Sequence, residues 1–186
     1  MESRLYKKYK TEIVPALKDQ LGLRNVMQAP KLIKVVLNIG YGRFVKETAL
    51  VEMMEKTLQV ISGQKPNHNK SKKSISNFKI REGMNIGVSV TLRGKKMYDF
   101  IDKLISITLP RVRDFRGLSR KGFDQQGNYC IGFKEHNAFP EVKVESMEKM
   151  HGLQVVISTS AKNKLAGVAL LEKLGFPFKK SETEKE

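Results

Sequence analysis

Hydrophobic and polar residues alternate along three segments of the chain, residues 32–40, 85–93 and 153–159. Because successive side chains of a β-strand point to opposite faces, this alternation predicts three half-buried strands. Two further short extended segments are predicted at residues 127–133 and 139–144. The predicted buried positions of the first two strands are Ile33, Val35, Leu37 and Ile39, and Ile86, Val88, Val90 and Leu92.

Four other segments carry apolar residues at helical spacing, and we predict helices there. They lie near residues 3–23, 48–62, 97–109 and 161–174. Pro15 falls inside the first of them. Because proline lacks an N–H donor and clashes with the preceding turn, this segment should bend or divide into two short helices.

The alternation of the strands decides the predicted fold class. A sheet that is covered by helices on both faces has strands that are apolar almost throughout. Here one face of each strand is polar, so we expect helices on one face of a mainly antiparallel sheet and an open, polar face opposite. The class is therefore α+β, in a single domain over residues 1–180 with an N-terminal helical extension over 1–24. The polar tail, residues 181–186, is expected to be disordered.

The charge of the chain narrows the functional classes. Its 186 residues include 35 Lys and Arg and 19 Asp and Glu, a formal net charge of +16. Such an excess indicates a polyanionic partner, either nucleic acid or an anionic membrane. No apolar run approaches the roughly 20 residues of a membrane-spanning helix, and the N-terminus lacks the apolar centre of a signal peptide. With Cys130 as the single cysteine, we expect a cytoplasmic protein without disulfides.

Positive charge is concentrated between Gln64 and Arg81, a segment without carboxylates. Its ammonium groups suit phosphates, its hydroxyls and amides suit sugars and base edges, and Phe78 can stack on a base. We predict a loop that binds a polyanion, although a solvated basic loop without a partner has the same composition. A second basic segment, residues 110–123, contains glycines and has no periodicity, which predicts a long mobile loop.

The polar faces of the strands carry residues that can bind RNA. By their alternation, Lys34, Asn38, Ser89, Thr91 and Arg93 can lie on one exposed sheet surface. Small donors and acceptors flanked by cations suit the RNA minor groove, where 2′-hydroxyls and base edges are accessible. Solvated strands also carry Ser and Thr for reasons of strand propensity. It is the combination with the net charge that favours RNA or DNA binding.

Signals for catalysis or metal binding are weak. Gly40 and Gly42 lack the third glycine of a dinucleotide-binding loop. The three histidines and Cys130 do not have the spacing of a zinc site. Cys130 lies in an apolar strand, where we predict a small packed side chain. We therefore predict a binding protein with no catalytic residues, no bound metal and no cofactor.

Short motifs follow one another along nearly the whole chain. They are Asn25-x-Met27-Gln28-x-Pro30-Lys31, Lys34-x-x-x-Asn38-x-Gly40-x-Gly42, Gly63-Gln64-Lys65-Pro66, Lys72-Lys73-Ser74-Ile75-x-x-Phe78-Lys79-x-Arg81-x-Gly83, Leu109-Pro110-Arg111-Val112-Arg113-Asp114-Phe115-Arg116-Gly117 and Phe139-Pro140-Glu141. Their order and spacing resemble those of the bacterial family of large-subunit ribosomal protein number five. Cys130 and the residues after Lys180 depart from the usual pattern, and neither falls in a motif.

This resemblance implies a structural protein of the ribosome. It implies binding to 5S rRNA, which the family helps to attach in the central protuberance beside large-subunit rRNA and neighbouring ribosomal proteins. It also implies contacts with peptidyl-site (P-site) tRNA and, in an intersubunit bridge, with small-subunit ribosomal protein number thirteen. No membrane contact is implied.

Matched residue by residue, the family's contacts fall on three sets of positions. The set implied for 5S rRNA is Met27, Gln28, Lys31, Lys34, Asn38, Gln64, Arg81, Ser89, Thr91 and Arg93. The set implied for tRNA is Lys70, Lys72, Lys73, Ser74, Phe78 and Lys79. The set implied for the intersubunit bridge is Arg111, Arg113, Asp114, Phe115 and Arg116.

Two other functions are compatible with the residues. A non-specific RNA-binding protein or RNA chaperone would show the same charge, and binding to unrelated RNA with equal affinity would reveal it. An RNA-modifying enzyme would need a catalytic motif that the sequence does not display, and turnover of RNA would reveal it.

Overall fold

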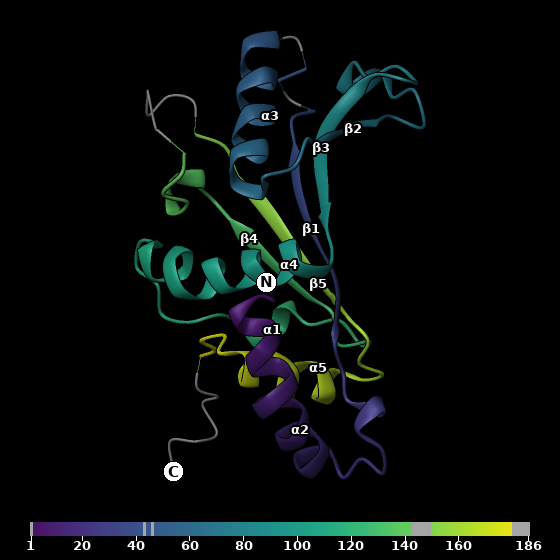
Figure 1. The fold of residues 1–186 in the computed structure, drawn as a ribbon. Coiled ribbons are helices and arrows are strands. Elements are labelled where there is room, and N and C mark those ends of the chain that lie inside the picture. Colours follow the sequence, from purple (N-terminus) through teal and green to yellow (C-terminus); the bar gives the residue numbers. More distant parts are fainter. Residues whose placement is uncertain (1, 43, 46, 143–149, 180–186) are drawn as a thin grey trace. The chain divides into compact units, whose positions relative to one another are not determined.

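The structure is a computed structural model that describes residues 2–42, 44–45, 47–142 and 150–179. Five strands form one antiparallel sheet in the order β2-β3-β1-β5-β4. The predicted α+β class with a mainly antiparallel sheet is confirmed (Figure 1). The strands are β1 (Leu32–Gly40), β2 (Asn67–Lys70), β3 (Asn85–Leu92), β4 (Tyr129–Phe133) and β5 (Leu153–Thr159).

The helices lie close to the four predicted segments. The longer ones and their π-helical turns are α1 (Arg4–Lys8), η1 (Tyr9–Ile13), α2 (Val14–Leu21), α3 (Thr48–Ser62), α4 (Gly94–Lys103), η4 (Leu104–Thr108) and α5 (Lys164–Leu174). The short 3-10 helices are η2 (Val26–Gln28), η3 (Ser76–Phe78), η5 (Leu109–Arg111), η6 (Arg120–Gly122) and η7 (His136–Ala138). As predicted near Pro15, two short α-helices replace one: α1 and α2 are joined by the π-helical turn η1, and the backbone stays helical throughout. Pro15 lies in the first turn of α2.

The chain divides into two compact units. The first comprises Met1–Val35, Arg93–Ile131 and Val156–Glu186, and the second comprises Val36–Leu92 and Gly132–Val155. The predicted single domain over residues 1–180, with its helical extension, stays a prediction. The predicted disordered tail, residues 181–186, lies outside the described residues.

The second unit packs α3 against one face of β3. Val88 and Val90 are buried, whereas Ser89 is half-buried and Thr91 is exposed, so the predicted alternation holds from Val88 to Leu92; at the start of β3, Ile86 is half-buried and Gly87 is buried. Helix α3 ends at Gly63, whose φ of 62° is the left-handed conformation that glycine adopts without strain. In Figure 1 the hairpin of β2 and β3 curves away from α3.

The first unit buries the faces of its helices against one another. Helix α1 packs on α4, and α2 packs on α5. The rings of Tyr6 and Tyr9 lie against Tyr98, with a centroid distance of 4.9 Å between Tyr6 and Tyr98. The Tyr9 hydroxyl donates to the carbonyl oxygen of Pro30 over 3.0 Å, which ties this aromatic cluster to the residues just before β1.

The predicted loop between Gln64 and Arg81 contains a strand. β2 pairs antiparallel with β3, with Asn67 opposite Ser89 and Asn69 opposite Gly87. The sequence Asn-His-Asn-Lys has no apolar alternation, so periodicity could not reveal a strand held at the sheet edge by main-chain hydrogen bonds. The prediction of a loop is therefore wrong for residues 67–70.

Three smaller predictions also need correction. Ile33 is 41% exposed, because Leu32 rather than Ile33 turns inward at the start of β1. The expected extended segment over 139–144 is a turn as far as residue 142 and lies outside the described residues beyond it; Pro140 cannot donate to a strand ladder. Cys130 is exposed, because its neighbours on β4 take the buried side.

Candidate nucleic-acid interface

Four polar side chains occupy the face of the second unit opposite to its buried valines. We call Asn38, Asn69, Ser89 and Thr91 the polar sheet face. Three of them come from three different strands and are joined by hydrogen bonds. The Ser89 hydroxyl donates to Asn69 Oδ1 over 3.0 Å, and Asn69 Nδ2 donates to Asn38 Oδ1 over 3.4 Å. The structure thus brings Asn38 and Ser89 together, through a residue that the sequence had not singled out.

Gln64 joins the polar sheet face from the loop after α3. Its Nε2 donates to the carbonyl oxygen of Thr91 over 3.4 Å. The Ser62 hydroxyl donates to the Leu58 carbonyl over 2.7 Å and accepts from the Gln64 N–H over 3.2 Å, which ties Gln64 to the end of α3. Gln64 and Thr91, both predicted 5S rRNA contacts, are therefore neighbours.

The opposite side of β2 is anchored to α3. Tyr41 O–H lies 3.3 Å from His68 Nδ1, and His68 Nε2 lies 3.4 Å from a carboxylate oxygen of Glu55. Burial and the charge of Glu55 raise the pKa of Tyr41, so its hydroxyl remains protonated and can donate. These three side chains line a cavity of about 360 Å³ together with Met84 and residues of α3. Because His68 and Asn69 are adjacent, this anchor helps to fix the polar sheet face on the other side.

We call residues 70–84 the arm. Beyond β2, Ser71 N–H donates to the Met84 carbonyl over 2.8 Å, and Ile75 and Ile80 exchange main-chain hydrogen bonds of 2.9 and 3.1 Å. Lys79 adopts a left-handed φ of 54° after the turn of η3. The Ser74 hydroxyl oxygen accepts from Glu82 N–H over 2.9 Å, so this predicted tRNA contact also holds the arm together. The arm is thus a folded hairpin rather than an irregular loop.

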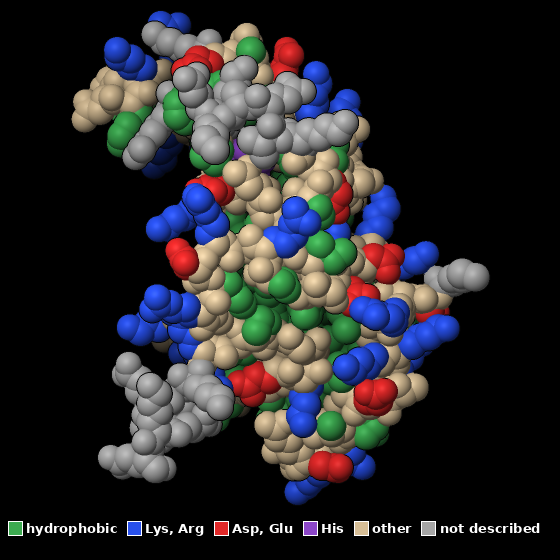
Figure 2. Space-filling view, turned by 90° about the vertical axis from the view of Figure 1, so that its left-hand side faces the viewer, with side chains coloured by type: hydrophobic (Ala, Val, Ile, Leu, Met, Phe, Trp, Pro, Cys, Tyr) green, Lys and Arg blue, Asp and Glu red, His purple; other side chains and the backbone are tan. Residues whose placement is uncertain are grey.

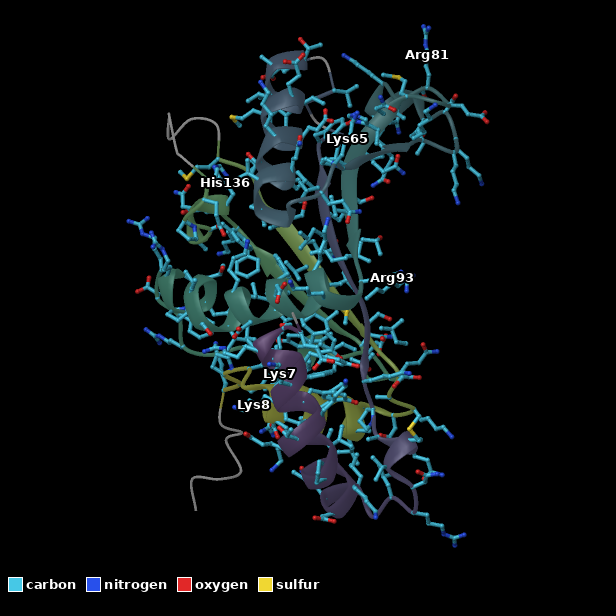
Figure 3. The ribbon with its side chains drawn as sticks, in the orientation of Figure 1. Lys7, Lys8, Lys65, Arg81, Arg93 and His136 are labelled. Atoms are coloured by element: carbon cyan, nitrogen blue, oxygen red, sulfur yellow. The ribbon has the colours of Figure 1, made fainter. Side chains whose placement is uncertain are left out.

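The cations of the arm are presented to solvent. Lys70, Lys72, Lys73, Lys79 and Arg81 are exposed, and none is ion-paired within the part of the chain that the structure describes. Phe78 is 70% exposed among them. The Arg81 side chain points outward from the end of the arm (Figure 3). Five cations and one exposed ring on a hairpin can hold phosphates and stack on a base.

The remaining predicted 5S rRNA contacts belong to the first unit. Met27 and Gln28 are exposed on η2, where Asn25 Oδ1 accepts from the Met27 N–H over 3.0 Å. Lys31 is exposed, and its N–H donates to Ser160 Oγ over 2.9 Å. Lys34 is half-buried on β1, and Arg93 precedes α4 with its side chain pointing away from the ribbon (Figure 3).

The predicted bridge residues lie in a segment with more structure than we expected. Arg111 ends η5, and Asp114 has a positive φ of 50°. Further along, Leu118 N–H donates to the Pro177 carbonyl over 2.8 Å, and Tyr129 O–H donates to the Ser119 carbonyl over 2.8 Å. The segment therefore contains two short 3-10 helices, η5 and η6, and main-chain hydrogen bonds hold Leu118 to Pro177 and Lys179; its mobility stays a prediction. Arg111, Arg113 and Arg116 remain exposed.

Positive charge extends beyond these segments. Figure 2 shows Lys and Arg side chains spread over the face that it displays, with acidic side chains among them.

Over the described residues, no group of three or more His, Cys, Asp and Glu side chains could hold a metal ion. In the same part of the chain, no helix is long and apolar enough to cross a bilayer.

The other two histidines form a buried pair in the second unit. The rings of His136 and His151 stack with centroids 4.2 Å apart, and His151 N–H donates to His136 Nδ1 over 3.4 Å. Burial lowers the pKa of His136, against smaller opposing effects of this hydrogen bond and of Glu135. A neutral, stacked imidazole contributes packing rather than a ligand for RNA.

Comparison with known proteins assigns this basic, polar-faced fold to a class. The family described as ribosomal protein L5 matches residues 25–81, and the ribosomal L5P family C-terminus matches residues 85–178. The large ribosomal subunit protein uL5 of Caldanaerobacter subterraneus subsp. tengcongensis is 52% identical over 96% of this chain and 99% of its own length. The proteins of the same name from Syntrophotalea carbinolica and Desulfotalea psychrophila are 51% and 53% identical, over 97% and 96% of this chain and 98% and 99% of their own lengths.

These relatives are proteins of the large ribosomal subunit. The chain belongs to the ribosomal protein L5 family, whose relatives carry the name uL5, and the resemblance of its motifs is confirmed. It is a structural constituent of the large subunit, associated with rRNA and ribosomal proteins. The family is not enzymatic, so the alternative of an RNA-modifying enzyme does not hold.

Proposed function

We propose that this chain binds 5S rRNA through the polar sheet face and helps to attach it in the central protuberance of the cytoplasmic ribosome. The observation that carries the proposal is the hydrogen-bonded set of Asn38, Asn69 and Ser89, drawn from three strands. Fixed small donors and acceptors suit the wide minor groove of RNA. Gln64 and Thr91 extend this surface, and Met27, Gln28, Lys31, Lys34, Arg81 and Arg93 are proposed to add contacts.

In this proposal the arm contacts a second RNA, the P-site tRNA. Its exposed cations and the exposed ring of Phe78 support the assignment, since neither is used in the packing of the unit. The exposed arginines from Arg111 to Arg116 form the proposed intersubunit bridge, a contact with small-subunit ribosomal protein number thirteen. Their backbone is held by hydrogen bonds on either side, which supports a rigid contact.

One observation favours a second candidate, a non-specific RNA-binding protein. The arm presents unpaired cations that bind any phosphate backbone. A titration of the purified chain with 5S rRNA and with an unrelated RNA of equal length, at several salt concentrations, separates the two functions. Between about 50 and about 200 mM salt, a protein with six to ten phosphate contacts loses about 10³–10⁵ in affinity for either RNA.

Specific binding predicts that 5S rRNA keeps a clear advantage at the higher salt concentration, because hydrogen bonds to base edges and sugars are less sensitive to salt than phosphate contacts. Equal affinities for the two RNAs under those conditions would reject the specific function and favour the second candidate.

A further inference from the structure

Asn69 reaches across a strand to meet Asn38. β3 lies between β2 and β1 in the sheet, and Gly87 of β3 is directly opposite Asn69. A Cβ atom at Gly87 would lie 3.8 Å from Asn69 Nδ2 and only 3.0 Å from the Ile39 carbonyl oxygen. Because Gly87 has no side chain, the amide of Asn69 can pass over it and donate to Asn38 Oδ1 over 3.4 Å.

The hydrogen bonds of this cluster fix the orientation of its two side-chain amides. Ser89 O–H donates to Asn69 Oδ1, and Asn69 Nδ2 donates to Asn38 Oδ1. An amide carries its oxygen and its NH₂ group on the same carbon, so turning the Asn38 oxygen toward Asn69 turns the Asn38 NH₂ group away. Linked hydrogen bonds of this kind also polarise and strengthen one another.

We infer that Asn69 is a positioning residue that makes Asn38 a hydrogen-bond donor toward RNA. The complementary ligand is an acceptor-rich minor groove, in which purine N3, pyrimidine O2 and 2′-hydroxyl oxygens are accessible. This inference rests on the proposed 5S rRNA function. It adds that Asn69 decides whether the Asn38 amide presents its donor or its acceptor to the RNA. Asn69 lies outside every motif that the family resemblance supplied.

The test replaces Asn69 with aspartate. The carboxylate of Asn69→Asp can still accept from Ser89, but it has no proton to donate to Asn38. The Asn38 amide should then turn over, donate to the new carboxylate and present its oxygen to the RNA. We expect affinity for 5S rRNA to fall at least tenfold, the scale set by an unsatisfied buried donor or acceptor.

The matched control is Asn137→Asp. Asn137 is an exposed residue of the second unit that lies outside the cluster and outside every predicted contact set, so the variant adds the same charge without touching the cluster. We expect its affinity to stay within about threefold of the parent chain, since a single exposed charge contributes little. Urea unfolding of all variants shows whether a loss of binding reflects a loss of folding. Asn69→Ala, which adds no charge, should show a smaller loss than Asn69→Asp.

A spectroscopic readout separates positioning from simple packing. The side-chain ¹⁵N resonance of Asn38 should shift in Asn69→Asp and stay in place in Asn137→Asp. The inference is overturned if Asn69→Asp and Asn137→Asp bind 5S rRNA equally while Asn38→Ala and Thr91→Ala still weaken binding. If Asn38→Ala and Thr91→Ala bind like the parent chain, the proposed function of the polar sheet face fails as well.

Discussion

The arm and the polar sheet face belong to the same unit and differ in how their side chains are held. The arm carries its cations on a hairpin whose stability comes from main-chain hydrogen bonds, so its lysines are exposed and unpaired among the described residues. The polar sheet face holds Asn38, Asn69 and Ser89 in hydrogen bonds to one another, and Asn38, Asn69 and Ser89 are only half exposed.

The difference separates two tasks of RNA recognition. Exposed ammonium groups can follow a phosphate backbone wherever it lies, and they supply affinity that depends on salt. Side chains fixed in one orientation can match only certain donors and acceptors, and they supply selectivity. A protein with a net charge of +16 does not lack affinity for RNA. Its selectivity has to come from groups whose geometry is fixed.

The largest effect should come from the arm. Replacing Lys70, Lys72 and Lys73 with alanine removes three exposed charges, each worth about 1 kcal/mol against a phosphate, so affinity for tRNA should fall roughly 100-fold while binding to 5S rRNA is largely kept. The salt dependence of tRNA binding should weaken by about one phosphate contact for each lysine. Fluorescence titrations at several salt concentrations measure both quantities.

The control for that variant removes the same charge elsewhere. Lys162, Lys164 and Lys173 are exposed in the first unit and outside every predicted contact set. If their replacement by alanine costs as much affinity, net charge rather than the arm is responsible, and the contrast between the two regions disappears.

A smaller effect is expected at Phe78. The ring is 70% exposed, so Phe78→Ala should leave the free energy of unfolding unchanged. Loss of base stacking costs about 2 kcal/mol, which is roughly 30-fold in binding. Ribosomes assembled with the variant should release P-site tRNA faster, and Phe78→Tyr should restore the parent rate. A normal release rate in Phe78→Ala would remove the ring from the tRNA contact.

Asn38→Ala tests the polar sheet face. We expect about tenfold weaker binding of 5S rRNA, because one oriented donor is lost. The slope of affinity against salt should stay as in the parent chain, in contrast to the lysine variant. Asn137, an exposed residue outside the predicted contacts, supplies the control Asn137→Ala. A changed salt slope, or equal losses in both variants, would contradict the assignment of selectivity to this face.

The smallest effect concerns stability. Burial lowers the pKa of His136 below its ordinary value of 6.5. The unfolded chain therefore binds a proton more readily than the folded chain, and stability falls as the pH drops below 6.5 through the lowered folded value. This contribution is fully present above 6.5.

Urea unfolding across this pH range measures the effect. His136→Phe keeps an aromatic ring in the stack and cannot titrate, so its stability should fall less steeply than that of the parent chain. The same slope in both proteins would show that His136 does not contribute.

Parts of the fold that depend on apolar periodicity could be predicted. β1, β3, β5 and the helices around Pro15 each bury one face. The buried positions are apolar and recur with the period of the strand or helix, so the sequence shows them directly. β2 could not be found this way, because Asn-His-Asn-Lys buries little and is held by the main chain of β3. The same holds for Leu118, whose partners in the chain are Pro177 and Lys179.

In the candidate site, too, some features follow from the sequence and others only from the tertiary structure. The sequence by itself determined the excess of cations between Gln64 and Arg81, the polar side of β3 and the motifs that mark the family. Only the tertiary structure decided that Asn69 passes over Gly87 to Asn38, 31 positions away in the chain. Local composition fixes which groups are available, whereas the register between strands fixes which of them meet.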